Sequence, residues 1–555
     1  KLAIDPEIQT IVEDTLQNWN KYPATADKND AIFRVKNSDG TFEEIVQPQA
    51  AAAVLDYRTG ELKAIVGGRT KPTQQKTLNR AHSMNMPIGS TIKPIAVFAP
   101  AIDTGAGPAS IVYNLPIPIE GWLNDNKENS FPKNYGGGSY NGVETMREAL
   151  RKSHNTSTAS AFSMFVGTNK SVDYLHRLGV DSKNINATPF GLALGSSGIT
   201  PIQLSTAYGV FANAGVYQEP ISVLGISDSN GNVIFDAHKE QRIYQAVQPS
   251  TAWLITDILK DAIQHGTGVN AQFKGQTLAG KTGTNSDHRG VTFAGYSGYY
   301  SSAIWVGHDN YKPLSSKATG GGTAGAIWKN YMEEIHKKKS LPNKDILSGD
   351  PSDYGLVKVA TCPVSGQLAT EECYHDHMGR QVVTDWWPAN AVPQDRCQMH
   401  TSITICRQSG MPVGPNCPQE DYVNASGIVI PPGHPLYKYA GTQYEEVIRQ
   451  YIGDSVSFGS NIDLSDPSNQ CNVHTSSTIS SLPQSVESNN SIINEANTLL
   501  QQANLLLTSN QNHPNINLLV SAISNLQNQL QNNPSDAMRI YTFMLELTNT
   551  MGQFY

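Results

Sequence analysis

The pattern of apolar and polar residues changes along the first 340 residues from strands to helices and back to strands. Residues 49–68, QAAAAVLDYRTGELKAIVGG, contain two apolar runs around a turn that includes Gly60, which predicts a β-hairpin. Residues 31–46 predict a second hairpin, which turns at Asp39 and Gly40.

Apolar residues recur at helical spacing through the middle of this region, and strand-like runs return after it. The helical pattern covers residues 88–103, 142–165, 200–216 and 248–265. The later strand-like runs are 276–284, 292–300 and 301–309, followed by a last helix within 319–339. This order predicts an α+β domain in which early and late segments of the chain contribute strands to one antiparallel sheet flanked by helices.

Composition marks where this domain ends. Residues 340–355, SLPNKDILSGDPSDYG, are rich in Pro, Gly, Ser and Asp, as linkers are. We therefore expect an N-terminal linker and hairpin segment at 1–48 and the α+β domain at 49–345. At 555 residues, the chain is long enough for further domains.

Every cysteine follows that boundary. The six are Cys362, Cys373, Cys397, Cys406, Cys417 and Cys471. The segments CPVSGQLATEEC, from Cys362, and CRQSGMPVGPNC, from Cys406, share the frame CxxSG, six residues and C, which indicates a duplicated β module at 355–453. Cysteines confined to one module are typical of a disulfide-stapled part of an exported protein.

The repeat favours one of the fifteen pairings that six cysteines allow. Disulfides Cys362–Cys373 and Cys406–Cys417 would close each copy and leave Cys397 to pair with Cys471. A zinc site formed by Cys373, His375 and His377 is the alternative, and we disfavour it because the CxxC spacing typical of structural zinc is missing.

The C-terminal part separates into a polar linker and a helical region. Residues 454–482 are rich in Ser, Asn and Asp, which indicates a linker. Residues 483–555 contain three segments with apolar residues at helical spacing, which predict a small three-helix bundle.

Charge and hydropathy exclude some classes of function. The formal net charge of -8 argues against a nucleic-acid partner, because phosphate binding needs a basic face. No run approaches the roughly 18 apolar residues of a membrane span. The chain starts at Lys1 without an initiator Met, so we expect a fragment whose N-terminal membrane anchor is missing.

Three short motifs could carry chemistry together. Ser90 and Lys93 stand three residues apart in a helical stretch, so they share one face. Ser153 and Asn155 place a hydroxyl and an amide on one short turn, and residues 281–284, KTGT, place an ammonium group and two hydroxyls on a strand. A serine needs an adjacent base, and a lysine becomes that base only when burial or a nearby cation lowers its pKa.

In this order, SxxK, SxN and KTGT make the chain resemble the transpeptidase domain of class A penicillin-binding proteins, a penicillin-binding-protein and serine β-lactamase type of fold. The resemblance covers roughly residues 1–337, including LAIDPEIQ, DYRTGELKAIVGG and ALGSSGITPIQLSTAYGVFANAG. It implies that the glycosyltransferase domain that normally precedes this region is absent from the chain.

The resemblance implies a serine DD-transpeptidase that forms an acyl-enzyme on Ser90 and cross-links peptidoglycan stem peptides. Lys93 would accept the proton of Ser90, and Ser153 would relay it to the leaving amine. Asn155 would bind the substrate's amide group. The substrate's backbone and carboxylate would be bound by Lys281, Thr282, Gly283 and Thr284. The backbone N–H groups of Ser90 and Thr284 would form the oxyanion hole.

Two other functions stay open on the same residues. One is a DD-carboxypeptidase, in which water replaces the amine, and the other is a non-catalytic β-lactam receptor or wall-binding scaffold. A β-lactamase is disfavoured because Glu120, in EGWLN, precedes the SxN motif instead of following it.

The resemblance also implies partners and location. We expect peptidoglycan stem peptides as substrates, β-lactams as covalent inhibitors, and cell-wall, divisome or elongasome proteins as candidate partners. We expect no cofactor and no metal, and a location at the outer face of the bacterial cytoplasmic membrane.

Overall fold

The computed structural model of the chain describes residues 1–36, 40–72, 77–124, 126–453, 456–459, 470–474, 486–509, 515–534, 537–551 and 554. Two compact units are present, and each is described by itself. The first unit comprises Lys1–Thr404 and Val423–Ser465, and the second comprises Ile405–Tyr422 and Asp466–Tyr555.

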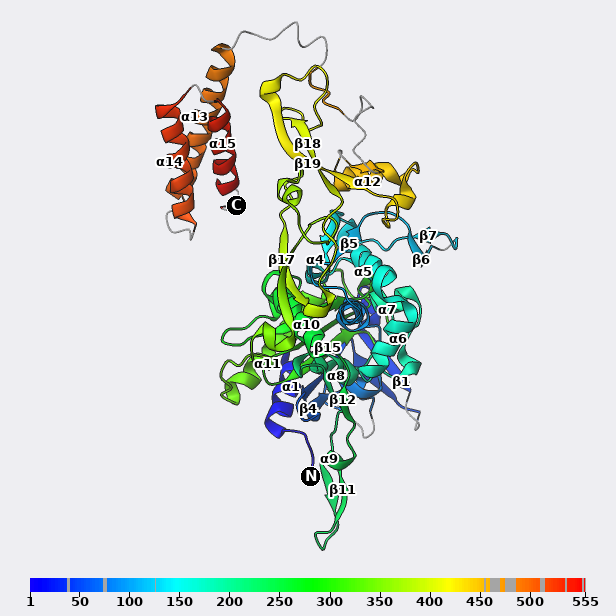
Figure 1. The fold of residues 1–555 in the computed structure, drawn as a ribbon. Helices are drawn as coiled ribbons and strands as arrows, with labels where there is room; N and C mark the ends of the chain where they lie inside the picture. Colours follow the sequence, from blue (N-terminus) through cyan, green and yellow to red (C-terminus); the bar gives the residue numbers. More distant parts are fainter. Residues whose placement is uncertain are drawn as a thin grey trace. The chain divides into compact units, whose positions relative to one another are not determined.

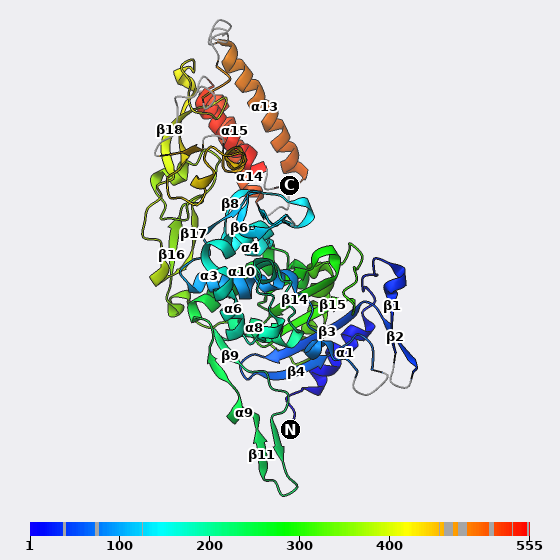
Figure 2. The same cartoon turned by 90° about the vertical axis from the view of Figure 1, so that its right-hand side faces the viewer.

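A five-stranded antiparallel sheet is the centre of the first unit (Figures 1 and 2). Its strands, in spatial order, are β13 (Ala279–Thr284), β14 (Gly290–Tyr296), β15 (Ser301–Gly307), β3 (Gln49–Asp56) and β4 (Glu61–Val66). Early and late segments therefore meet where β15 pairs with β3, with Ala303 opposite Ala53. The predicted α+β class is confirmed.

Helices cover both faces of this sheet. The helices α8 (Pro201–Ala212) and α10 (Pro249–His265) pack on one face, and α1 (Pro6–Asn18) and α11 (Ala326–Lys338) pack on the other. Along β3, Ala53 and Leu55 join the core of the first face, whereas Ala52 and Val54 join the core of the second. Because side chains alternate along a strand, this one strand contributes to two cores.

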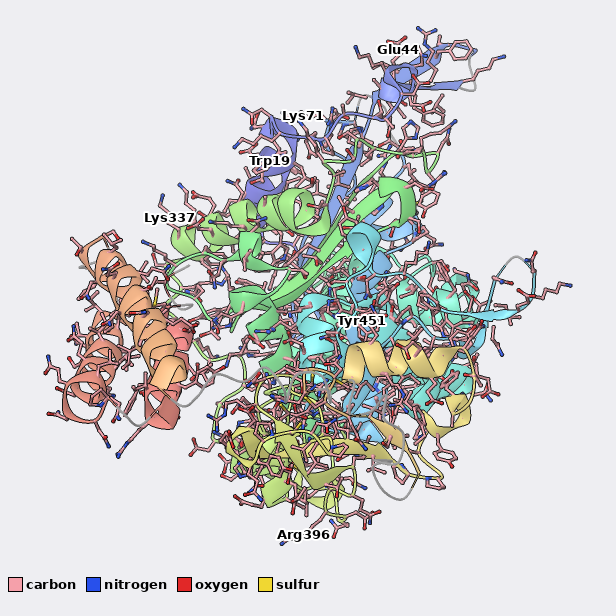
Figure 3. The ribbon with its side chains drawn as sticks, turned by 90° about the horizontal axis from the view of Figure 1, so that it is seen from above. Trp19, Glu44, Lys71, Lys337, Arg396 and Tyr451 are labelled. Atoms are coloured by element: carbon pink, nitrogen blue, oxygen red, sulfur yellow. The ribbon has the colours of Figure 1, made fainter. Side chains whose placement is uncertain are left out.

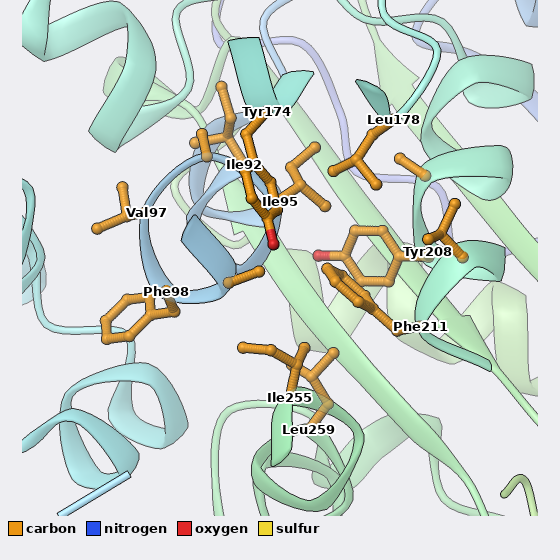
Figure 4. Packing of buried hydrophobic residues seen from close by; sticks show 14 of the residues in the cluster. Ile92, Ile95, Val97, Phe98, Tyr174, Leu178, Tyr208, Phe211, Ile255 and Leu259 are labelled. Carbon is orange, nitrogen blue, oxygen red and sulfur yellow. The ribbon is translucent and has the colours of Figure 1, made fainter. Parts of the chain in front are cut away.

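The core beneath α8 and α10 also holds the segment that carries Ser90 and Lys93. In Figure 4, Ile92 and Ile95 of this segment lie near Tyr208 and Phe211 of α8 and Ile255 of α10. The hydroxyl of Tyr208 donates a hydrogen bond to the carbonyl oxygen of Thr91 at 2.8 Å. Packed aromatic and aliphatic side chains thereby hold the segment that carries Ser90 and Lys93 in place.

Smaller elements surround this framework. The helices are α2 (Arg80–Ser83), α3 (Ala99–Asp103), α4 (Met146–Lys152), α5 (Asn155–Ala161), α6 (Gly167–Arg177), α7 (Pro189–Leu194) and α9 (Ala237–Glu240). The strand pairs are β1 (Ile32–Lys36) with β2 (Phe42–Val46), β5 (Ile111–Asn114) with β8 (Gly142–Thr145), β6 (Ile119–Leu123) with β7 (Asn129–Ser130), β9 (Val216–Gln218) with β12 (Ile243–Gln245), and β10 (Gly225–Ser227) with β11 (Val233–Asp236). Figure 3 shows Glu44 of the β1–β2 hairpin projecting away from the sheet. That hairpin was predicted, although Asp39 of its turn lies outside the described residues.

The helical stretch predicted at 88–103 is not one regular α-helix. It consists of a 3₁₀ turn at Gly89–Ile92, a π-helical turn at Pro94–Phe98, and α3. Pro94 has no N–H to donate to the carbonyl of Ser90, and the N–H of Lys93 donates to that carbonyl instead. The helix predicted from residue 142 begins only at Met146, because residues 142–145 pair with β5 as β8.

The region after the main domain is built from short strands. They are β16 (Leu356–Thr361), β17 (Val383–Pro388), β18 (His400–Cys406), β19 (Tyr422–Ile430) and β20 (Ser457–Phe458), accompanied by α12 (Tyr444–Ile452). Both CxxSG frames form the same turn, since the N–H of Gly366 donates to the carbonyl of Cys362 and the N–H of Gly410 donates to that of Cys406. The sequence repeat is therefore a structural repeat at these turns.

The predicted disulfides are absent. All six cysteines are buried and free. The alternative zinc ligands also fail to meet, because His375 faces Glu371 and Nδ1 of His377 lies 3.1 Å from the carbonyl oxygen of Ser426. Cys373 instead lies beside two other cysteines and His400.

The second unit contains the helices α13 (Val486–Ser509), α14 (Ile516–Asn532) and α15 (Ala537–Met551), which share one apolar core. Most of the predicted linker at 454–482 lies outside the described residues, and the domain boundaries expected from the sequence stay predictions. Among the helices of the described part, none is both long and apolar enough to cross a membrane.

Candidate active site

A cleft of about 470 Å³ runs along the outer edge of β13, and we name it the β13 cleft. Residues from all three sequence motifs line it, namely Ser90, Ser153, Asn155, Thr282 and Thr284. Its other walls include Lys133, Tyr135, Asn270, Tyr311 and the glycines 320–322. Lys93 and Lys281 have no exposed surface, so the two amines lie behind the wall that the substrate would touch.

Ser90 reaches the cleft because Gly89 adopts a left-handed conformation with φ +56°. A Cβ atom at position 89 would lie 2.9 Å from the carbonyl oxygen of Thr284 and 2.8 Å from Oδ1 of Asn285. The N–H of Gly89 also donates to the carbonyl of Gly195 at 3.0 Å. Only glycine combines this φ with this close approach to β13, so the turn places Ser90 beside Thr284.

Lys93 lies at the junction of the first two motifs. Its Nζ donates to Oδ1 of Asn155 at 2.8 Å and to the carbonyl of Ser153 at 2.7 Å, and it lies 3.4 Å from Oγ of Ser153. Its fourth contact is the carbonyl of His154 at 3.3 Å, so Ser90 Oγ is not among its hydrogen-bond partners. Hydrogen bonds between nucleophile and base are often long before substrate binds.

Burial favours the neutral form of the Lys93 amine. Desolvation lowers the pKa of Lys93 well below 10.5, and the nearby positive charge of Lys281 lowers it further, while Glu144 acts in the opposite direction. Burial also lowers the pKa of Lys281, to about 7. Burial of both amines, together with the charge of Lys281 beside Lys93, makes a neutral Lys93 accessible near neutral pH.

The SxN turn is held by a buried polar network. Ser153 ends α4 with φ +63°, and Nδ1 of His154 lies 2.8 Å from Oε1 of Glu144. Oδ1 of Asn134 accepts from the N–H of Asn155 at 2.7 Å, while Nδ2 of Asn155 donates to the carbonyl of Lys133 at 2.9 Å. The side-chain amide of Asn155 is thereby bonded at both ends, and the second hydrogen of Nδ2 can donate to a substrate amide while the first keeps its bond to Lys133.

β13 offers open backbone groups to the cleft. The N–H of Asn285 donates to Gly290 of β14, and N–H directions alternate along a strand. The N–H of Thr284 therefore points to the open edge, on the same side as Ser90. The hydroxyl of Thr284 accepts from the N–H of Gly320 at 2.9 Å, and that of Thr282 lies 2.7 Å from the hydroxyl of Thr267.

Gly283 also serves packing between β13 and the segment that carries Ser90. A Cβ at position 283 would lie 2.2 Å from Oγ1 of Thr292 and 2.3 Å from the carbonyl oxygen of Ile88. Oγ1 of Thr292 donates to that same carbonyl at 2.6 Å. The glycine thus lets the segment that carries Ser90 approach the sheet, which shortens the distance between Ser90 and the strand.

Sequence reasoning missed the supporting residues Glu144, Asn134 and Thr292. None of them belongs to a short motif, so pattern alone gave no signal for them. Glu120, considered for a β-lactamase, lines a separate pocket with Tyr113 and Met164 and not the β13 cleft.

Comparison with known proteins agrees with this geometry. Residues 50–333, just over half of the chain, match the family described as "Penicillin binding protein transpeptidase domain". The chain belongs to this transpeptidase family. Residues 354–402 match a second description, "Penicillin-binding protein 1A, C-terminal domain", so the transpeptidase region is of the 1A type.

Relatives with the name penicillin-binding protein 1A support the assignment. The protein of Clostridium perfringens is 33% identical over 413 residues, which cover 73% of this chain and 47% of the relative. The protein of Neisseria meningitidis is 33% identical over 332 residues, which cover 59% of this chain and 41% of the relative. The chain therefore spans about half the length of the relatives it matches.

Solved structures share the fold of this transpeptidase domain. Penicillin-binding protein 1A from Haemophilus influenzae aligns with a TM-score of 0.57 at 20% identity, covering 71% of this chain and 72% of that one. The penicillin-binding protein PonA1 from Mycobacterium tuberculosis aligns with a TM-score of 0.51 at 22% identity, covering 63% of this chain and 87% of that one.

Because its amine is buried, we expect Lys281 to lower the stability of the fold while it supports the activity of the site. Lowering its pKa from 10.5 to about 7 means that the unfolded state binds more protons between these pH values, so this lysine destabilises the fold at neutral pH. We expect Lys281→Met to raise the free energy of unfolding at pH 7 by about 2–4 kcal/mol. The gain shrinks as pH rises through this window and is absent above pH 10.5.

Chemical denaturation of both proteins at pH 7 and at pH 10 measures this effect. Removing the charge that lowers the pKa of Lys93 also predicts that acylation of the variant needs a higher pH. A Lys281→Met variant less stable than the parent at pH 7 would contradict the prediction. The exposed Lys274→Met is the matched control and leaves both measurements unchanged.

Proposed function

We propose that the chain is a serine DD-transpeptidase that cross-links peptidoglycan stem peptides ending in D-Ala-D-Ala through an acyl-enzyme on Ser90. One observation carries the proposal. A fully buried lysine, Lys93, bonds to both residues of the SxN motif directly behind a cleft that Ser90 and the open edge of β13 line.

Acylation follows from these positions. Oγ of Ser90 attacks the carbonyl carbon of the penultimate D-Ala, and neutral Lys93 accepts the hydroxyl proton. The carbon–nitrogen bond breaks, and the terminal D-Ala leaves as an amine after receiving a proton from Lys93 through the hydroxyl of Ser153. The 3.4 Å between Nζ of Lys93 and Oγ of Ser153 suits this relay.

Transfer reverses the proton path. An amine of a neighbouring stem peptide attacks the ester carbonyl and gives its proton to Lys93, a new amide bond forms, and the oxygen of Ser90 leaves and recovers a proton. The N–H groups of Ser90 and Thr284 stabilise the oxyanion in both steps, and losing one such donor lowers a rate by about 10²–10³-fold.

Substrate binding uses the strand. An extended peptide adds to the open edge of β13, where the N–H groups of Thr282 and Thr284 point outward. The hydroxyls of these threonines bind the terminal carboxylate, which also favours the protonated form of Lys281. Asn155 binds the amide group of the substrate.

The substrate places the reaction outside the cytoplasmic membrane, at its outer face, where stem peptides are cross-linked. β-Lactams, as mimics of the D-Ala-D-Ala end, acylate Ser90 and block the site. Cell-wall, divisome or elongasome proteins are the corresponding partners.

A two-substrate assay tests this function. The purified chain is given a thioester analogue of a stem peptide as acyl donor, with and without D-alanine as amine acceptor, and products are separated by mass. We expect an amide product whose share rises with acceptor concentration, and preincubation with penicillin abolishes it. Release of the acid alone, independent of acceptor, would identify a carboxypeptidase, and no acylation at all would identify a non-catalytic scaffold.

A further inference from the structure

Two buried clusters of identical composition lie outside the β13 cleft. Within the described residues, Cys362, Cys373, Cys397 and His400 form the first, and Cys406, Cys417, Cys471 and His474 form the second. In each cluster, the Sγ atoms and a histidine nitrogen all lie within 4.8 Å of one another. We name them the first and second CCCH clusters, and each lies within one unit of the chain.

The sequence spacing of the two clusters matches. Ten residues separate the first two cysteines of each set, and two residues separate the third cysteine from the histidine. Only the distance between the second and third cysteine differs, at 23 and 53 intervening residues. The repeat that suggested disulfides is thus one half of a longer pattern, Cys-x10-Cys followed by Cys-x2-His.

The distances in each cluster fit one ion with four ligands. Nδ1 of His400 lies 3.2 Å from Sγ of Cys362 and 3.5 Å from Sγ of Cys397. Nδ1 of His474 lies 3.4 Å from Sγ of both Cys406 and Cys471. A tetrahedral zinc site with ordinary bond lengths has sulfur–nitrogen edges of about 3.5 Å, and donors this close leave no room for a multi-iron cluster.

Each histidine is oriented by a carboxylate. Nε2 of His400 lies 2.9 Å from Oδ2 of Asp376, and Nε2 of His474 lies 3.2 Å from Oδ2 of Asp421. The carboxylate accepts the Nε2–H, which leaves the lone pair of Nδ1 directed at the thiols. A carboxylate behind the histidine is the usual outer support of a metal-bound imidazole.

Backbone N–H groups surround the sulfur atoms. The N–H groups of Val364 and Ser365 both lie 3.3 Å from Sγ of Cys362. In the second cluster, the N–H of Gly414 lies 3.4 Å from Sγ of Cys417. Such donors stabilise negative charge on sulfur, which a neutral thiol or a disulfide does not need.

The odd number of cysteines in each cluster argues against disulfides, and the small apolar cluster around the second set argues against a purely apolar core. Three cysteines in a cluster cannot all pair as disulfides within it. Among the described residues, the apolar cluster around the second set consists of its three cysteines and the half-buried Val413. So small a core does not stabilise a fold without a cross-link or a metal.

We propose that each CCCH cluster binds one zinc ion through three cysteine thiolates and Nδ1 of its histidine. Binding releases three thiol protons for each ion. All four positions of the tetrahedron are filled by protein, so the sites are structural and not catalytic. The proposal replaces the expectation of disulfides and of no metal, and it is independent of the proposed transpeptidase activity.

The ions would stabilise the modules that follow the catalytic domain. In the first unit, the ion joins the turn after β16 to the start of β18. In the second unit, it joins the 406–417 turn to residues 471–474. Because an unfolded chain has no preformed site, metal binding contributes directly to the folding of such small modules.

Metal analysis of the full chain tests the proposal. We expect two zinc ions per chain after purification, one in Cys373→Ser and in Cys417→Ser, and none in the double variant. The exposed His375→Ala is the matched control and keeps two. Substitution with Co²⁺ should give the absorption of tetrahedral cobalt together with thiolate-to-cobalt charge transfer, at half intensity in each single variant.

A variant that keeps every ligand tests the first site even if the cysteine variants misfold. Asp376→Asn leaves all eight ligands in place, and we expect it to weaken zinc binding at the first cluster by about 10–100-fold in chelator competition while the second is unchanged. Chain isolated without metal, with disulfides found by mass spectrometry or with all six thiols reacting freely, would overturn the proposal. A stoichiometry of one would overturn it for the cluster whose cysteine variant loses no metal.

Discussion

Ser90→Ala will lose covalent labelling by fluorescent penicillin entirely, while the parent chain labels. Among the described residues, Ser90 is the only residue with a hydroxyl that follows a glycine of positive φ, lines the β13 cleft and precedes a buried lysine by three positions. Removing a catalytic serine also lowers turnover by about 10⁶-fold, because binding and oxyanion stabilisation alone remain. Denaturing gel electrophoresis after incubation with the labelled drug measures the first effect, and turnover of the thioester donor measures the second.

Two comparisons make this result specific. The exposed Ser163→Ala should label like the parent, since its hydroxyl lies away from the β13 cleft. Ser153→Ala should still label, but more slowly, because it removes a proton relay and not the nucleophile. A labelled band that persists in Ser90→Ala would mean that another residue is acylated.

Lys93→Met will slow acylation by about 10²–10⁴-fold, the usual contribution of a general base. Methionine fills a similar volume but accepts no proton, so Ser90 stays a poor nucleophile. In the parent chain, the rate falls as pH decreases through the lowered pKa of Lys93, since protonation removes the base. The variant should lack this pH dependence, and stopped-flow measurement of acylation by a chromogenic β-lactam from pH 5 to 10 would show both effects.

Substitutions of Lys93 should change the rate of acylation without lowering the stability of the fold. Because burial disfavours the charged amine, Lys93→Met should unfold at a temperature no lower than the parent does. Lys93→Arg should not restore activity, since a guanidinium group stays protonated throughout this pH range. Acylation of Lys93→Met at the parent rate would remove Lys93 from the mechanism.

The sequence revealed the three motifs and their order, but not the residues that hold them in position. Ser90, Ser153 and Thr284 lie in local patterns of a few residues, and the structure brings them to one cleft. The Glu144–His154 pair joins a strand to a turn, and Thr292 reaches Ile88 across about 200 positions of sequence. Long-range contacts of this kind leave no periodic signal in one sequence.

The cysteine clusters, too, were only partly predictable from the sequence. The CxxSG repeat was recognised and its spacing favoured pairing within each copy, whereas the Cys-x2-His spacing that follows was not recognised as part of the pattern. In the structure, Cys397 lies with Cys362 and Cys373, which gives a set of three thiols and a histidine. Which cysteine meets which histidine depends on how β16 and β18 are placed, and spacing cannot supply this.

By itself, the sequence determined the α+β class, the strands of the central sheet and the three transpeptidase motifs, because each depends on local periodicity or on residues that are neighbours in the chain. Only the tertiary structure decided that both lysines are buried, that Gly283 serves packing, and that the cysteines gather with histidines. Burial and side-chain proximity are properties of the assembled core, since they depend on which distant segments cover a residue.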